Sequence, residues 1–206
     1  MKVRTEARRE AIVQEAAKLF RELGYEGASM SELAQRLGGS KATLYGYFPS
    51  KEALFVAVTQ AMGDLHLADA LSKLAATRSE EFEPALRRFG EAMVMLANES
   101  DAMAVYRMVV GESGRSDVGQ LFFDVGPRRC IDAVADFMRN AIERGDLRPA
   151  KPDVLARLCL GLLTAETEDR LFQRDAAPLS RAQARGIVER ALEVFLRGCA
   201  APRRGA

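Results

Sequence analysis

The feature that most constrains the fold of this chain is a helical repeat of apolar residues that extends over most of its length. In the first segment the repeat follows the i, i+4, i+7, i+8, i+11 pattern of one helix face, formed by Ile12, Ala16, Leu19, Phe20 and Leu23. No segment shows the sustained alternation of apolar and polar residues that is typical of strands. The sequence therefore predicts an all-α fold.

Glycine, proline, serine and aspartate mark the boundaries between the expected helices. Thr5 can cap the first helix and Gly24 can end it. Beyond residue 50, helices are expected at about 51–76, 80–99, 101–112, 117–125, 127–144, 152–173 and 180–197. The tail, residues 200–206, is expected to be disordered.

Charge is unevenly distributed along the chain. The 206 residues are 48% hydrophobic and 29% charged, which is typical of a soluble globular protein with a substantial core. Residues 1–51 carry nine Lys and Arg but six Glu, a net charge of +3, whereas the remainder carries −2. A basic N-terminal segment favours a polyanionic partner for that segment.

Cysteine and histidine usage argues against a metal site. Cys130, Cys159 and Cys199 lie far apart, in no metal-binding spacing, and are expected to be buried or free thiols in a reducing compartment. His66 is the only histidine in the sequence, which excludes multi-histidine metal sites and leaves few arrangements for a general base. We therefore expect no metal and no cofactor.

Motifs of enzymes and of membrane proteins are also missing from the sequence. The stretch GESGR at 111–115 ends in Arg115, so it is not a G-x-S-x-G nucleophile motif, and no G-x-G-x-x-G occurs. The N-terminus lacks the apolar core of a signal peptide, and no apolar run reaches about 18 residues. We expect a cytoplasmic protein that is not an enzyme and has no membrane segment.

The stretch LGGSKATLYGYFPSKEALF, residues 37–55, predicts a helix-turn-helix. Ser29, followed three residues later by Glu32, can cap a short second helix. Two glycines then break the chain, Ser40 can cap a third helix through about residue 47, and Ser50 can cap the fourth. Two short helices joined by a tight glycine-containing turn are typical of proteins that place the second helix in the DNA major groove.

The exposed start of the third helix is suited to contact DNA. Helix N-termini attract phosphate because their free N–H groups and the helix dipole point there. Ala42 is small enough to let the backbone approach base edges, and Thr43 can bond a base or touch a thymine methyl group. Leu44 and Phe48 are expected to pack in the core.

Five further motifs cover residues 7–55 almost without a gap: A-x-x-L-F, G-Y/F-x-x-x-S/T, L-A-x-x-L-G, S-K-x-T-L-Y and F-x-S-K-E-x-L. Together they resemble the DNA-binding domain of the TetR (tetracycline repressor-like) family. The resemblance implies an all-helical homodimer with its recognition helix at about 41–47. Gly46 departs from the pattern, where Tyr or another larger residue is usual, so one phosphate or base contact of the family is not expected here.

The resemblance also implies roles for individual residues. It assigns a phosphate contact to Tyr45, the family's aromatic or histidine position to Tyr47, the lysine that opens the fourth helix to Lys51, and the start of the second helix to Ser29. The alternatives are core packing for the two tyrosines and simple solvation for the lysines. The residues predicted to contact DNA are Ser29, Ser40, Lys41, Ala42, Thr43, Tyr45, Tyr47 and Lys51.

The larger C-terminal part contains the stretches YRMVVGESGRSDVGQLFFDVGPRR and RGDLRP. These stretches resemble the regulatory domain of the AefR-like TetR subgroup. In the family this domain dimerises and encloses an inducer pocket. We therefore expect a DNA-binding domain at 1–50 and a regulatory and dimerisation domain at 51–199, with the helix at 51–76 linking the two.

Two helices near the C-terminus carry apolar faces broad enough to form a dimer interface of four helices. The predicted interface residues are Leu158, Gly161, Leu162, Ala165, Ile187, Ala191, Val194 and Phe195. The alternative is that these faces pack within one chain.

Soft and aromatic side chains in the middle helices are candidates for an inducer pocket. The predicted lining residues are Met62, Leu65, Phe89, Met93, Met103, Tyr106, Arg107, Phe122, Phe123 and Glu166. The alternatives are that most of them are core, and that Glu166 forms a surface ion pair with Arg170 at i+4. Their apolar character favours a small hydrophobic or amphipathic inducer.

The sequence as a whole predicts a ligand-responsive transcriptional regulator, expected to be a repressor that binds an inverted-repeat operator as a homodimer. Its partners would be double-stranded DNA, a small inducer and a second copy of the chain. The alternative is a DNA-binding protein of the same fold that needs no inducer and acts as a nucleoid or cell-division factor.

Overall fold

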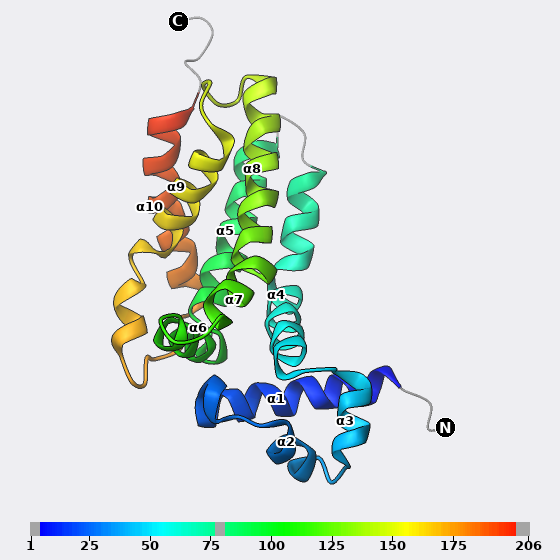
Figure 1. Ribbon diagram of the computed structural model, residues 1–206. Coiled ribbons are helices and arrows are strands. Elements are labelled where there is room, and N and C mark those ends of the chain that lie inside the picture. Colours follow the sequence, from blue (N-terminus) through cyan, green and yellow to red (C-terminus); the bar gives the residue numbers. More distant parts are fainter. Residues whose placement is uncertain (1–4, 77–80, 201–206) are drawn as a thin grey trace, which may run out of the picture. The chain divides into compact units, whose positions relative to one another are not determined.

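The computed structural model describes residues 5–76 and 81–200, and the side chains of these residues other than 63–66. The elements along this part of the chain are helices, in the order shown in Figure 1: α1 Glu6–Gly27, α2 Met30–Arg36, α3 Lys41–Tyr47, α4 Lys51–Ala75, α5 Phe82–Ala97, α6 Ser100–Glu112, α7 Val118–Val125, α8 Pro127–Arg144, α9 Pro152–Ala165, the 3-10 helix η2 Glu168–Phe172, and α10 Arg181–Cys199. The all-α prediction is confirmed. The predicted disordered tail lies, apart from Ala200, outside the described residues.

The first helix begins after Thr5 and is interrupted at Gly24, the two residues predicted to mark its ends. The Thr5 hydroxyl accepts a hydrogen bond of 3.3 Å from the Arg8 amide. Gly24 has φ of 72°, so the regular helix is interrupted there, although one further turn continues to Gly27. Side-chain caps and a left-handed glycine are signals that lie within a few residues of the helix end, which is why the sequence reveals them.

The predicted single helix at 152–173 is wrong. The structure ends α9 at Ala165 and starts a separate 3-10 turn at Glu168. Thr167 lies between them with its hydroxyl buried, donating to the carbonyl of Thr164 and accepting from the amide of Asn98, 69 residues away. This distant partner holds the chain in a conformation that helical periodicity alone does not predict.

Contacts divide the chain into two compact units that alternate along the sequence. The first unit comprises residues 1–63 and 104–126, and the second comprises 64–103 and 127–206. Buried side chains of α1 to α4 share one core with Val105, Val109 and Val118 of α6 and α7. At its centre the rings of Phe20, Tyr25 and Phe55 lie 5.3 to 5.8 Å apart.

In the second unit α5, α8, α9 and α10 lie side by side around a separate core. Gly90 allows α5 to approach its neighbours closely, because a Cβ there would lie 2.9 Å from Val188 and 3.0 Å from Leu163. The C-terminal end of α10 is fastened by a hydrogen bond of 3.0 Å from the Arg148 amide to the Cys199 carbonyl. Across the residues that the structure describes, no helix is both long and apolar enough to span a bilayer.

Candidate nucleic-acid interface

Helices α2 and α3 form a tight helix-turn-helix whose start points are capped as predicted. Ser29 accepts a hydrogen bond of 3.1 Å from the Glu32 amide, and Ser40 accepts one of 3.1 Å from the Thr43 amide. Between the helices Gly38 has φ of 60°, a left-handed conformation that other residues adopt at a cost. The caps thus fix where each helix begins, and Gly38 allows the chain to turn between them.

Arg8 of α1 fastens this turn from outside the motif. Its guanidinium donates a hydrogen bond of 3.1 Å to the carbonyl of Leu37, the C-cap residue that follows α2. A Cβ at Gly39 would lie 3.4 Å from the same guanidinium. Arg8 thus provides a hydrogen-bond donor for one of the carbonyl groups that have no partner within the helix at its C-terminal end. The sequence analysis did not find this role, since 29 residues separate the two partners.

The solvent-facing side of α3 carries the residues predicted to read DNA. Lys41, Ala42, Thr43 and Tyr45 are exposed, and the Thr43 hydroxyl lies 2.9 Å from that of its cap, Ser40. On the opposite side Leu44 and Phe48 are each 3% exposed, so they are core residues, as predicted. The core fixes the helix while its polar face stays available.

Tyr47 is half-buried and packs against the core of the first unit. Its phenol oxygen accepts a hydrogen bond of 3.2 Å from the backbone amide of Thr5. Because the oxygen is the acceptor in this bond, the phenol hydrogen remains to be donated elsewhere. The structure thus gives Tyr47 a packing role at the ring together with a positioned donor at its tip.

Lys51 is held by the end of α1. Its ammonium donates a hydrogen bond of 3.0 Å to the carbonyl of Tyr25 and lies 4.2 Å from that ring's centroid, with Glu26 at 4.0 Å. The Tyr25 hydroxyl donates at 3.3 Å to Glu52. Burial, followed by the charge of Glu52, raises the pKa of Tyr25 above its ordinary value. Next to this cluster the Ser50 hydroxyl accepts from the Ala53 amide at 3.2 Å, so the third predicted cap is also formed.

An ion-pair cluster ties α2 to α1. The guanidinium of Arg36 lies 2.7 Å from Glu22, 3.2 Å from Glu32 and 3.9 Å from Glu15. The hydrogen bonds that the Arg36 guanidinium donates to Glu22 and then to Glu32 raise the pKa of Arg36. Together with the hydrogen bond from Arg8 to Leu37, these ion pairs join the helix-turn-helix to α1.

The residues predicted for the dimer interface fall into two groups. Those buried in the core of a single chain, at 2 to 6% exposure, are Ile187, Ala191 and Phe195. They pack against neighbouring helices of their own chain, so we assign them to the core rather than to an interface. Leu158, Gly161, Ala165 and Val194 are exposed, and Leu162 is half-buried. Leu158 and Val194 are 53% and 61% exposed, which leaves apolar surface that this chain does not cover.

The residues predicted for the inducer pocket are divided between the two units. Met62, Tyr106, Arg107, Phe122 and Phe123 belong to the first, and Phe89, Met93, Met103 and Glu166 belong to the second. The Tyr106 and Phe122 rings meet edge to face at 6.2 Å. Phe89 and Met103 are buried, at 0% and 4% exposure. The side chain of Leu65 lies outside those described, as does that of His66.

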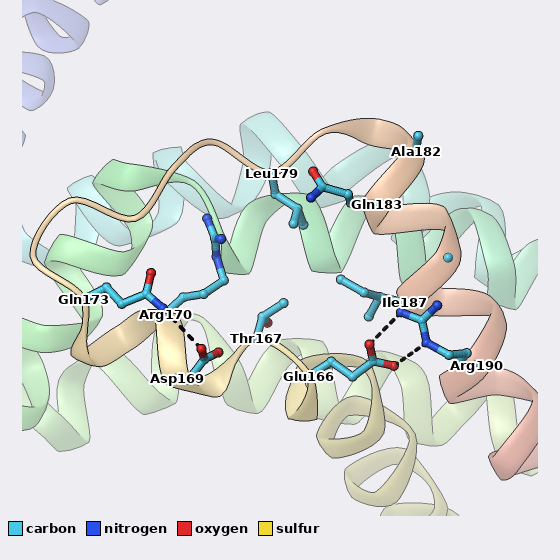
Figure 2. A pocket seen from close by; sticks show the side chains of 11 residues that line it. Glu166, Thr167, Asp169, Arg170, Gln173, Leu179, Ala182, Gln183, Ile187 and Arg190 are labelled. Carbon is cyan, nitrogen blue, oxygen red and sulfur yellow. Dashed lines mark hydrogen bonds and ion pairs between the residues drawn. The ribbon is translucent and has the colours of Figure 1, made fainter.

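Glu166 lines an open groove of about 590 Å³ between the end of α9, η2 and the start of α10 (Figure 2). Its carboxylate binds Arg190 of α10 with both oxygens, at 2.6 and 2.8 Å. The predicted i, i+4 pair with Arg170 requires a continuous helix, which ends before Glu166, and Arg170 instead donates to the carbonyl of Ala177. The hydrogen bonds from Arg190 lower the pKa of Glu166.

Comparisons with known proteins match the N-terminal and the C-terminal parts of the chain to two separate family models. Residues 12–58 match the family of bacterial regulatory proteins named after tetR, and residues 84–200 match the C-terminal domain of AefR-like transcriptional repressors. A solved structure of the flavonoid-responsive regulator FrrA is 30% identical, with a TM-score of 0.72, and the alignment covers 97% of this chain and 100% of that one. A TetR family regulator from Pseudomonas syringae pv. tomato DC3000 is 27% identical over the same shares, with a TM-score of 0.71.

Curated relatives match over a shorter part of the chain. The transcriptional regulator RutR of Escherichia coli K12 is 40% identical over 62 residues, which are 30% of this chain and 29% of RutR. The class C tetracycline repressor of Escherichia coli is 41% identical over 54 residues, 26% of this chain and 25% of that protein. This chain thus matches less than a third of these relatives' length. The C-terminal match to the AefR-like model alone extends over more than half of the chain, and the chain belongs to the TetR family of bacterial transcriptional regulators.

Proposed function

We propose that this protein is a ligand-responsive repressor that binds an inverted-repeat operator as a homodimer. The observation that carries the proposal is the exposed polar face of α3. On the opposite side of this segment Leu44 and Phe48 are buried in the core and hold the helix in place. A rigid helix with an exposed, capped N-terminal half is the arrangement that reads base edges in a major groove.

Each contact has a separate chemical task. Lys41, Ala42 and Thr43 face the bases, and the N-termini of α2 and α3 offer backbone amides to phosphates. Tyr45, which is 47% exposed, and the phenol hydrogen of Tyr47 serve as phosphate donors. Lys51 adds positive charge at the start of α4. These contacts set register and affinity through phosphates and set sequence preference through two or three side chains.

A homodimer is supported by the uncovered apolar residues of α9 and α10. Leu158, Gly161 and Ala165 follow one another on an exposed stripe of α9, and Val194 is exposed on α10. For a two-fold dimer to bind successive major grooves, its two copies of α3 must lie about 34–36 Å apart. An inverted-repeat operator follows from that symmetry.

Regulation by a small molecule is supported by the AefR-like C-terminal domain and by the name of FrrA, a flavonoid-responsive regulator of similar structure. An inducer would act by binding more tightly to a dimer whose α3 helices no longer fit both half-sites. We therefore expect a hydrophobic or amphipathic inducer, with hydroxylated aromatic compounds as the first class to test.

The testing experiment is selection of bound DNA from a random duplex library at roughly physiological salt, where specific contacts must compete with phosphate attraction. A palindromic motif is expected. Titration of the resulting complex with a panel that includes a flavonoid and a fatty acid should then release the DNA with one compound class. No enriched motif from ligand-free protein would favour the inducer-independent, architectural alternative.

A further inference from the structure

Phe172 is the most exposed of the large apolar side chains in the described part of the chain. It lies on η2 and is 86% exposed, compared with 61% for Val194 and 58% for Val110. An aromatic ring left in water is a large potential source of binding energy, and aromatic residues are enriched among the anchors of protein interfaces.

The turn that carries Phe172 is fastened on both sides. Buried Asn98 donates a hydrogen bond of 3.1 Å to the Thr167 hydroxyl, and the guanidinium of Arg170 donates to the Ala177 carbonyl in the loop that leads to α10. The Glu166 and Arg190 ion pair joins the end of α9 to α10. A ring presented on so constrained a backbone loses little conformational entropy when it binds.

A groove lined by both polar and apolar side chains lies beside the same turn. Leu179, Ala182 and Ile187 contribute apolar atoms to its lining, and the Glu166 and Arg190 pair forms part of its polar rim (Figure 2). Arg170 and Gln173, which flank Phe172 in the sequence, also line the groove. The ring therefore originates at the rim of the groove without being covered by its own chain.

We propose that Phe172 of each copy enters the groove of a second copy, so that each groove is completed by the other chain. In a two-fold dimer the same surface patch of each copy faces the other. The projecting ring of the first copy can therefore enter the groove of the second, while the ring of the second enters the groove of the first. The proposal rests on the homodimer proposed above, and it adds the anchor of that dimer. The occupant is a second copy because the ring and the groove lie together at the end of α9 and the start of α10, the same two helices that carry the uncovered residues Leu158, Ala165 and Val194.

The first test is Phe172→Ala in the full chain. Because the ring is 86% exposed, each copy should keep its helical circular dichroism. The dimer dissociation constant measured by sedimentation should rise about tenfold or more. Val110→Ala, a matched change at an exposed apolar residue of the first unit, should leave the constant unchanged. Equal constants for wild type and Phe172→Ala would overturn the proposal.

The second test locates the ring directly. A photo-reactive phenylalanine is placed at position 172, isotope-labelled and unlabelled chains are mixed, and cross-linked peptides are identified by mass spectrometry. Cross-links between a labelled and an unlabelled chain, with residues 179–190 as the target, are expected. A dimer whose cross-links fall elsewhere, or only within one chain, would overturn the proposed role of Phe172 but not the proposed homodimer. A protein that is monomeric at every concentration would overturn both proposals.

Discussion

The ammonium of Lys51 lies 4.2 Å from the ring centroid of Tyr25 and donates a hydrogen bond of 3.0 Å to the carbonyl oxygen of the same residue. Tyr25 itself is 4% exposed; in the core of the first unit its ring stacks on Phe20 and meets Phe55 edge to face. Lys51 therefore joins the start of α4 to the end of α1. An ammonium has three donors, so this contact leaves capacity for a phosphate.

Replacement of Lys51 by alanine should affect both stability and DNA binding. Loss of the contacts with Tyr25 should lower the free energy of unfolding by about 1 kcal/mol, measured by urea denaturation. Loss of a phosphate contact should weaken binding to all DNA sequences alike and reduce the slope of log K against log salt by about one.

The two effects separate the two roles of Lys51. Lys73→Ala, at an exposed lysine further along α4 that pairs with Asp69, serves as the control and should change neither quantity by much. A stability loss at Lys51 with an unchanged salt slope would show that the residue only holds α4 against α1.

Thr43 is expected to determine base preference rather than general affinity. Thr43→Val keeps the shape of the side chain but removes the hydroxyl that lies 2.9 Å from Ser40. Discrimination at one base position should fall about tenfold, while non-specific binding stays the same. Ser31→Ala removes a hydroxyl from an exposed residue of α2 that we do not place at the bases, and should leave the selected motif intact. A uniform loss across all sequences would make Thr43 a packing or phosphate residue.

The parts of the site that could be predicted from sequence are those set by neighbours in the chain. The caps at Ser29, Ser40 and Ser50 depend on residues three positions away, and periodicity places Leu44 in the core. The bond from Thr5 to Tyr47 joins residues 42 apart, and no local pattern encodes it.

The parts that sequence reasoning missed have long-range causes. The end of α9 depends on the hydrogen bond from Asn98 to Thr167. Which of the predicted interface residues are buried depends on the neighbouring helices of the same chain that pack against them. Ile187 and Val194 both belong to the apolar pattern of one helix, yet one is 6% and the other 61% exposed. An apolar helix face that is wide enough to contact two neighbours does not show which of its residues are buried in the core of their own chain.

Gly161 tests the proposed dimer face without disturbing the fold of one copy. A Cβ at this position meets nothing within 4 Å, so Gly161→Leu adds a side chain into open space. The leucine should block close approach of a second α9 and yield monomers in sedimentation experiments. Gly111→Leu, on α6 and equally open around its Cβ, is the matched control and should remain dimeric. Persistent dimers of Gly161→Leu would place the interface elsewhere.

The three cysteines should differ sharply in reactivity. Burial raises the pKa of the Cys130 thiol to about 11 and, with smaller effects of Cys199 and Cys130, that of Cys159 to about 12. Since the thiolate is the reactive species, a disulfide reagent at pH 8 should modify only Cys199 quickly in the native chain and all three in denaturant. Cys199→Ala should abolish the fast phase. Fast modification of two or three thiols would contradict the burial of Cys130 and Cys159.

The same shifts predict a loss of stability at high pH. In the unfolded chain these thiols ionise near pH 9, whereas in the folded chain Cys130 and Cys159 hold their protons to about pH 11 and 12. Above pH 9 the unfolded state therefore binds fewer protons, and the free energy of unfolding should fall as pH rises through this window. Tyr25 acts in the same direction above its ordinary pKa. Urea denaturation between pH 8 and 11 measures the slope, and the double variant Cys130→Ala, Cys159→Ala should show a shallower decline than wild type. An equal slope in both proteins would mean that the two thiols are not shielded from water in the folded chain.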